Sequence, residues 1–220
     1  MKKTRMKKTR ARSKKEKEIQ YQRILEEGKE LFIKYGPGAL SMRTLAKRLN
    51  MTQTFLYTYI QSKRELWIAI RQKYFQRYLL EINKIINEHQ GTKVDLLMKL
   101  VERFIEFANE DFNRFMVMFI MPVPSSKKIG PIEKNYQQTG LLDKVKKILQ
   151  EAMIAKEIRE RNLDEFTYFI WSVIFGTITT DMYIKFQAPI MEYMKEKSPS
   201  FTKKSYRECA LKEIRNLLIG

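Results

Sequence analysis

Residues 41–60 hold two short amphipathic segments that are separated by a turn of about four residues. Ser41 and Thr52 are good N-cap residues, so each segment has its own start signal for a helix. Asn50 tolerates the left-handed backbone of a tight turn, and Ala46 is small where two helices must approach closely. The spacing therefore predicts a helix-turn-helix pair, whose second helix can enter the major groove of DNA.

Helices are expected on both sides of this pair. Apolar residues recur every three or four positions over 19–35, as in a helix packed on one face, and the Gly-Pro-Gly run at 36–38 ends the pattern. Ser62 and Glu65 have the spacing of a capping box, which predicts a long helix that begins at Lys63.

The rest of the chain has the same helical periodicity. Only eight Gly and six Pro occur in 220 residues, too few for a β-rich fold with many turns. We expect an all-α protein of about nine helices, with a three-helix helix-turn-helix domain over residues 19–66 and a larger helical domain over 67–220. The helices of the larger part are expected at 63–89, 93–109, 111–121, 133–156, 164–186 and 202–219.

Positive charge dominates the composition. The 43 Lys and Arg against 25 Asp and Glu leave a net charge of +18, which indicates a polyanionic partner. Residues 1–18 alone contain ten basic and two acidic residues. We expect them to form a disordered basic arm that binds along the nucleic-acid backbone. The alternative is a tail that only aids solubility.

Several functional classes are excluded by what the sequence lacks. One cysteine (Cys209) and one histidine (His89) rule out a disulfide framework, a Cys-rich zinc site and any mechanism that needs two imidazoles. We find no phosphate-binding glycine loop and no catalytic triad, so we expect neither an enzyme nor a metal or cofactor. The most apolar segment, 166–180, is too short to span a membrane, and no signal peptide is recognisable, so we expect a cytoplasmic protein.

The run LSMRTLAKRLNMTQTFLYTYIQSKRELWIAI, residues 40–70, resembles the DNA-binding signature of the TetR family of transcriptional regulators. The matching motifs are Leu45-Ala46, Leu56-Tyr57 and Ser62-Lys63-Arg64-Glu65-Leu66. The resemblance implies that residues 67–220 bind a ligand and form a dimer. It also implies a homodimeric regulator, a repressor, that binds a pseudo-palindromic double-stranded operator and is released by a small apolar or amphipathic effector.

By this resemblance, Gln53 and Thr54 occupy the positions that contact base edges. Gln can pair with adenine, and the Thr methyl can rest against the thymine methyl. Phe55 either extends the thymine contact or packs between helices. For Tyr57 and Tyr59, the alternative to a DNA contact is core packing. Contacts to the DNA backbone are expected from Ser41, Arg43, Thr52, Tyr57, Thr58, Tyr59 and Lys63.

The resemblance further implies a ligand cavity between the long helices of the second domain. Its walls are expected to include Phe104, Phe107, Phe115, Met118, Phe119, Tyr136, Tyr168, Trp171 and Phe175. Met side chains suit a pocket that accepts varied apolar molecules, although Met and Phe at helical spacing also suit an ordinary core.

The segment 164–186 is apolar nearly all round, so it needs burial on every side. In the family, this helix and the last one pair with their copies in a two-fold dimer. Asp181 is expected to pair with a Lys or Arg at that interface, or else to be the counter-charge of a cationic ligand.

The functions that compete with a transcriptional regulator are a non-specific nucleic-acid or chromosome-associated protein and a basic adaptor at an anionic membrane surface.

Overall fold

The computed structural model describes residues 10–137, 140–194 and 201–220. These residues form ten α-helices and one π-helix, with no strand among them, so the all-α prediction is confirmed. Within the same ranges, no helix is both long enough and apolar enough to cross a membrane. The described residues divide into two compact units, the first made of residues 10–76 and 113–137 and the second of 77–112, 140–194 and 201–220.

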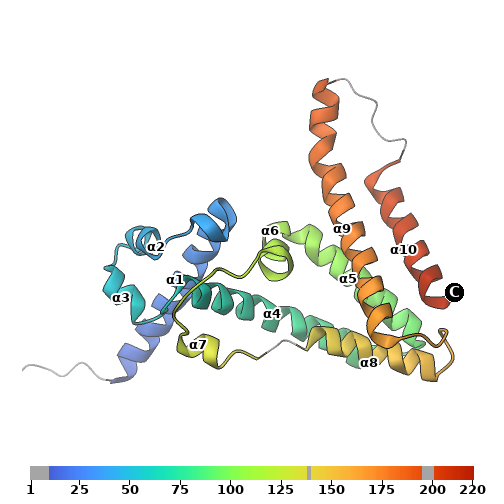
Figure 1. Ribbon diagram of the computed structural model, residues 1–220, viewed down its shortest axis with the longest axis horizontal. Coiled ribbons are helices and arrows are strands. Elements are labelled where there is room, and N and C mark those ends of the chain that lie inside the picture. Colours follow the sequence, from blue (N-terminus) through green and yellow to red (C-terminus); the bar gives the residue numbers. More distant parts are fainter. Residues whose placement is uncertain (1–9, 138–139, 195–200) are drawn as a thin grey trace, which may run out of the picture. The chain divides into compact units, whose positions relative to one another are not determined.

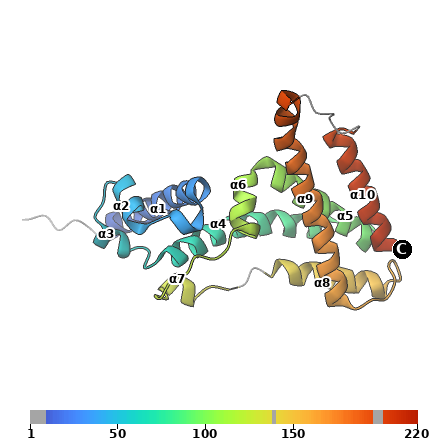
Figure 2. The ribbon, with the colours of Figure 1, turned by 45° about the horizontal axis from the view of Figure 1, so that its top comes forward.

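The first unit is built around the helix-turn-helix pair. It contains α1 (Arg10–Ala39), α2 (Met42–Arg48), α3 (Gln53–Tyr57) and the start of α4 (Lys63–Glu88), with α2 and α3 beside α1 (Figures 1 and 2). The chain returns to this unit through the end of α6 (Phe112–Phe115), the π-helix (Met116–Ile120) and α7 (Pro131–Lys134). Its core includes the buried side chains of Ile24, Phe32, Leu45, Leu56, Ile60, Leu66 and Val117.

Helix α1 starts earlier than the sequence indicated. Residues 10–18, expected to be part of a disordered arm, are helical, and residues 1–9 lie outside the described residues. Lys, Arg, Glu and Ala are strong helix formers, so a charged segment that continues an amphipathic helix can extend it. Gly36, with φ 70° and ψ 170°, interrupts the helix where the Gly-Pro-Gly run was expected to end it.

The division of the chain also differs from the expected boundary at residue 66. Residues 113–138 were expected in the C-terminal domain, but they pack with the helix-turn-helix pair. Val117 of the π-helix is fully buried in the core of the first unit, and Met121, Ile132 and Tyr136 pack against that core. This apolar segment belongs to the first unit because its side chains are buried there. The order of elements along the sequence does not reveal such a contact.

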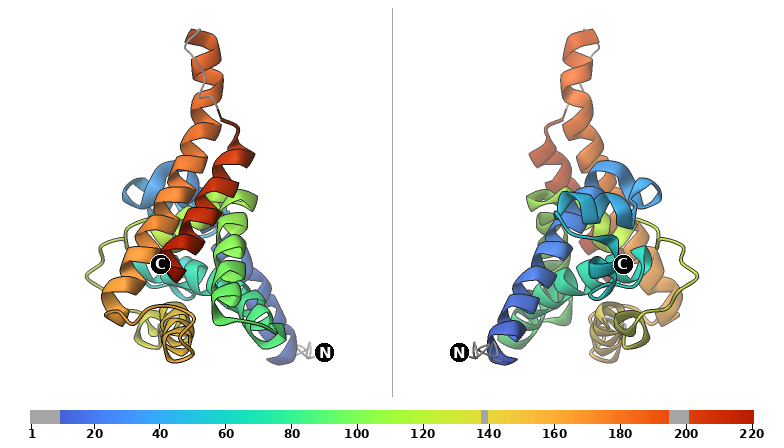
Figure 3. Two further views of the ribbon diagram at one scale, coloured as in Figure 1. Left: turned by 90° about the vertical axis from the view of Figure 1, so that its right-hand side faces the viewer. Right: turned by 90° about the vertical axis from the view of Figure 1, so that its left-hand side faces the viewer.

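The second unit is a bundle of long helices. It combines the end of α4 with α5 (Lys93–Glu110), α8 (Leu141–Ile154), α9 (Leu163–Met194) and α10 (Lys203–Ile219). Helix α10 runs beside α9, as both views of Figure 3 show, and α5 contacts α8, α9 and α10. This arrangement surrounds α5, whose apolar face carries ten buried residues.

Candidate nucleic-acid interface and apolar cavity

The turn between α2 and α3 has the caps that its sequence predicted. The Ser41 Oγ accepts a hydrogen bond from the Thr44 amide (3.0 Å), and the Thr52 Oγ1 accepts one from the Phe55 amide (3.2 Å). Asn50 has a φ of 52°, the left-handed conformation expected of a tight turn. The inner sides of the pair are buried through Leu45, Ala46, Leu49, Leu56 and Ile60.

The outer face of α3 carries the residues expected to read DNA. Gln53 and Thr54 are exposed, and Phe55 and Tyr57 leave 47% and 39% of their surfaces exposed. The Phe55 ring meets the half-buried ring of Tyr59 edge-on, with centroids 5.4 Å apart. A short capped helix whose large side chains point outward presents these groups to a base edge or a phosphate.

The other residues expected at phosphates lie at the ends of these helices. Ser41 and Arg43 are exposed at the start of α2, and Lys63 is half-buried at the start of α4. The Thr58 hydroxyl, directly after α3, donates to the carbonyl of Phe55 (2.7 Å). Hydroxyls and cations of this kind are the usual partners of backbone phosphates.

The carboxylate of Glu65, near the start of α4, is fully buried. One of its oxygens accepts a hydrogen bond from the Gln61 amide (2.5 Å), and the other accepts one from the Ile132 amide (2.8 Å). Glu65 also donates its own amide to the Ser62 Oγ (3.0 Å), which is one of the two hydrogen bonds of the expected capping box. Its carboxylate accepts from the amide of Gln61, one residue before the cap. The buried carboxylate thus joins the turn after α3 to the start of α7.

Two further contacts join the same segments. The Arg64 Nε lies 2.7 Å from the Glu133 Oε1, and the Lys128 ammonium lies 5.8 Å from the centre of the Tyr57 ring. This role of residues 128–133 was not expected from the sequence. No local pattern signals it, because the partners are more than sixty residues apart in the chain.

Four residues expected in the ligand cavity belong to the first unit instead. Phe115 and Met118 are buried there, and the Phe119 ring packs on Phe75 with centroids 5.1 Å apart. Tyr136 packs against the helix-turn-helix core. None of these four residues lines the cavity of the second unit.

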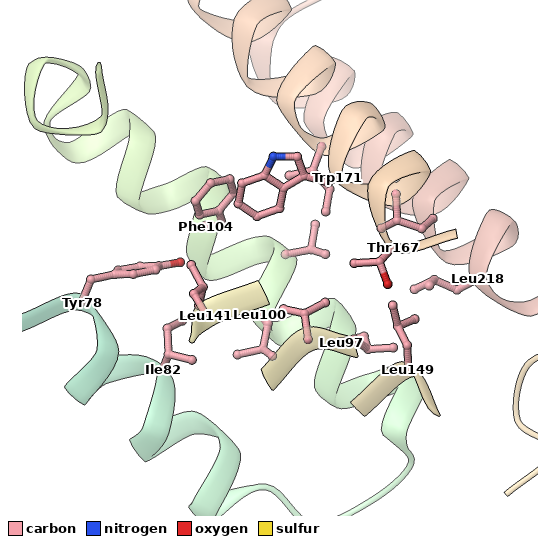
Figure 4. Close-up of a pocket in the computed structure, with 14 residues that line it drawn as sticks. Tyr78, Ile82, Leu97, Leu100, Phe104, Leu141, Leu149, Thr167, Trp171 and Leu218 are labelled. Atoms are coloured by element: carbon pink, nitrogen blue, oxygen red, sulfur yellow. The ribbon is translucent and has the colours of Figure 1, made fainter. Parts of the chain in front are cut away.

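The second unit encloses an apolar cavity of about 60 Å³ (Figure 4). Trp171 of α9 lies beside Phe104 of α5, with ring centroids 5.2 Å apart, and Tyr78 and Thr167 are the polar residues of its wall. The remaining wall residues are aliphatic: Ile82, Leu97, Leu100, Val101, Leu141, Val145, Leu149, Ile170, Ile174 and Leu218.

The two polar wall residues carry no charge into the cavity. The Thr167 hydroxyl donates to the carbonyl of Leu163 in its own helix (2.6 Å). Burial raises the pKa of the Tyr78 hydroxyl far above its usual range, so Tyr78 stays protonated at neutral pH. No charged side chain lines the cavity, which suits an uncharged apolar group.

Three other expected wall residues lie outside this cavity. Phe107 packs on Tyr78 (centroids 4.5 Å apart), Phe175 packs on Trp171 (4.9 Å), and Tyr168 is 58% exposed. Phe104 and Trp171 are thus the two expected residues that line it. The wall residues that α8 and α10 supply were not expected from the sequence. The apolar stripe of α8 could have suggested its part of the wall.

The surface of α9 combines a buried ion pair with exposed aromatic rings. The Asp181 carboxylate is fully buried and lies 2.6 Å from Arg207 and 3.5 Å from Lys203, both in α10 of the same chain. The expected pairing of Asp181 with a Lys or Arg is therefore present, and α10 supplies both cations. Exposed rings on α9 are those of Tyr168, Phe169, Tyr183 and Phe186.

Comparison with known proteins gives one family and many similar folds. Residues 24–70 match the family described as "Bacterial regulatory proteins, tetR family". No curated protein sequence matches the chain at a significant level. In the described ranges, no group of three or more His, Cys, Asp or Glu is arranged to hold a metal ion.

The similar solved structures are regulators. The fatty acid degradation regulator FadR from Bacillus halodurans is 17% identical, with a TM-score of 0.63 over 98% of this chain and 97% of that chain. FadR from Bacillus subtilis in complex with stearoyl-CoA is 16% identical (TM-score 0.63; 88% and 97% covered). AibR in complex with isovaleryl coenzyme A and operator DNA is also 16% identical (TM-score 0.60; 88% and 97% covered). These likenesses show the fold.

Proposed function

Because the chain carries the DNA-binding domain of the tetR family of bacterial regulatory proteins, we propose that it is a dimeric transcriptional repressor that an effector releases from its operator. The observation that carries the proposal is the outward face of α3. Gln53 and Thr54 are exposed on a capped helix whose other side is fixed in the core. Such a helix can present base-reading side chains to the major groove.

The proposed dimer forms through α9 and α10. Tyr168, Phe169, Tyr183 and Phe186 leave about half or more of their surfaces exposed on α9, more apolar surface than a monomer usually leaves uncovered. A two-fold interface would cover these rings and would place two copies of α3 on successive half-sites of one operator. Sedimentation at micromolar concentration should give a species of twice 26.4 kDa; a monomer would contradict the dimer.

The proposed effector places an uncharged apolar group in the cavity of the second unit. Similar folds hold stearoyl-CoA and isovaleryl coenzyme A, so an acyl thioester is the class we propose. The cavity has no charged wall residue, so the coenzyme part would stay outside it. A cavity of 150 Å³ holds benzene, and one of about 60 Å³ therefore suits a short acyl group better than a C18 chain.

The effector is tested by its influence on DNA binding. DNA affinity is measured by fluorescence anisotropy, with duplexes selected by the protein, at increasing isovaleryl-CoA and stearoyl-CoA. We expect isovaleryl-CoA to weaken DNA binding at lower concentration than stearoyl-CoA. Leu149→Phe, which fills the cavity from α8, should abolish the response, and Thr167→Val, which removes a hydroxyl bonded to its own helix, should keep it. No response to either thioester would contradict the proposed effector class.

The alternative is a non-specific nucleic-acid protein, for which the net charge of +18 would suffice. The two functions differ in the ratio of the affinity for the operator to the affinity for random DNA. A repressor should bind its operator at least about a thousandfold more tightly than random DNA at the same salt concentration, whereas a chromosome-associated protein should show a ratio near one.

A further inference from the structure

The helical extension at the start of α1 brings basic side chains next to the recognition helix. Helix α1 begins at Arg10, well before Ile24, where the family match begins. Along the extension, Lys14, Lys17 and Tyr21 follow one another at intervals of three and four residues, so they share one face of the helix.

That face forms one wall of a polar hollow of about 330 Å³. Lys14, Lys17, Glu18 and Tyr21 line it from α1, and Thr58 and Tyr59 line it from the segment that directly follows α3. The hollow therefore lies beside the C-terminal end of the short helix that carries Gln53 and Thr54.

Most of the polar groups that line the hollow are hydrogen-bond donors. Lys14 and Lys17 are exposed, and no carboxylate of the described chain lies within ion-pair distance of either ammonium. The one acid, Glu18, accepts a hydrogen bond from the Gln22 side chain (2.8 Å). Burial is the main cause that raises the pKa of Tyr21, and the carboxylates of Glu18 and Glu65 raise it further. The Tyr21 hydroxyl therefore stays protonated at neutral pH.

We propose that this hollow binds a phosphate of the DNA backbone, between the two lysine ammonium groups and the hydroxyls of Tyr21 and Tyr59. Two cations and several hydroxyl donors match the charge and the acceptor oxygens of a phosphodiester. The proposal rests on the proposed function, because the position beside α3 is what makes DNA the source of the phosphate. It assigns the start of α1 to the DNA-binding surface in addition to α2 and α3.

The test compares two double variants that remove equal charge. Lys14→Ala/Lys17→Ala empties the hollow of its cations, while Lys34→Ala/Lys84→Ala removes two exposed lysines that do not line it. The affinity of each full-length variant for a random-sequence 30-bp duplex is measured as a function of salt concentration. The conservative variant Lys14→Arg/Lys17→Arg serves as a rescue.

Each neutralised phosphate contributes about 0.9 to the slope of log affinity against log salt. We expect Lys14→Ala/Lys17→Ala to flatten the slope by about 0.9 for each subunit bound, because the hollow holds one phosphate. The Arg variant should keep the slope, and the Lys34/Lys84 control should change it by less than half as much. Equal changes in the two alanine variants would overturn the proposal. Unchanged thermal unfolding midpoints ensure that the comparison concerns binding.

Two further results separate the possible explanations. Titration with inorganic phosphate alone should show no saturable binding, because the other DNA contacts position the backbone phosphate in the hollow. Saturable phosphate binding without a slope change would assign the hollow to a free oxyanion and overturn the DNA assignment. Failure of the repressor proposal would appear elsewhere, as the absence of any preferred duplex sequence, while the slope on random DNA still reports on the hollow.

Discussion

Gly130 and Glu65 share one small space, although 65 residues separate them along the chain. A Cβ atom at Gly130 would lie 2.0 Å from the Glu65 Oε1. The carboxylate cannot simply move away, because the amides of Gln61 and Ile132 both donate to it. Gly130 has an ordinary φ of −87°, so this contact, rather than backbone conformation, requires glycine here.

Gly130→Ala should therefore destabilise the first unit. The added methyl would force the carboxylate out of its hydrogen bonds or lift the start of α7, and overpacking of this kind costs about 1–3 kcal/mol. The free energy of unfolding is measured by urea denaturation of both proteins. The same substitution in a Glu65→Ala background should cost less than about 0.5 kcal/mol, because the clash is gone. Equal costs in the two backgrounds would show that Glu65 is not the obstacle.

Substitutions on α3 should separate sequence preference from overall tightness. Gln53→Ala removes an exposed amide that can pair with a base, and we expect a loss of about 1–3 kcal/mol on the preferred duplex together with relaxed selectivity at one base pair. Tyr57→Phe removes an exposed hydroxyl and should weaken preferred and random DNA alike. The two effects are read from anisotropy titrations on both duplexes. An unchanged preference in Gln53→Ala would contradict the assignment of α3.

The Asp181 ion pair should be needed for the packing of α10 on α9. Arg207→Met leaves a fully buried carboxylate with Lys203 at 3.5 Å as its remaining cation, and breaking a buried pair costs about 3 kcal/mol. Replacing both partners, as in Asp181→Leu/Arg207→Met, should recover most of that stability, since no uncompensated charge remains. Urea denaturation measures both variants. If the double variant were the less stable one, the buried pair would be a net source of stability.

Tyr78 should give the folded protein a specific sensitivity to alkaline pH. Its pKa is raised above the ordinary value of 10.0 by burial. The unfolded chain therefore ionises first, so the stabilising contribution of Tyr78 is complete below pH 10 and is lost as the pH rises further. Tyr78→Phe should reduce the fall of the unfolding free energy above pH 10 by about 1.4 kcal/mol per pH unit. The control Tyr35→Phe alters a side chain that is 48% exposed and lies outside the proposed dimer interface, so it should leave the fall unchanged.

The parts of the fold that local chemistry determines were predictable. Ser41, Thr52 and Asn50 define the two caps and the turn through contacts with residues at most three positions away, and all three have their expected geometry. The hydrogen bond from the Glu65 amide to the Ser62 Oγ is equally local. The second partner of Glu65, the Ile132 amide, comes from a distant segment and has no signature in the sequence.

The cavity was predicted less well because its walls depend on tertiary packing. Phe115 and Met118 have the same residue types and helical spacing as a ligand pocket, but both are buried in the first unit and neither lines the cavity. Leu141, Leu149 and Leu218 line the cavity because α8 and α10 pack around α5. Helical periodicity shows which face of a helix is apolar, but it does not show which helices meet.

Selection of DNA from a random-sequence library tests the central claim most directly. The full-length protein is used to enrich bound duplexes over several rounds, and the enriched sequences are then compared with random DNA at one salt concentration. The account predicts a two-fold symmetric sequence, bound at least about a thousandfold more tightly than random DNA. Enrichment of no sequence, with equal affinity for all duplexes, would contradict it.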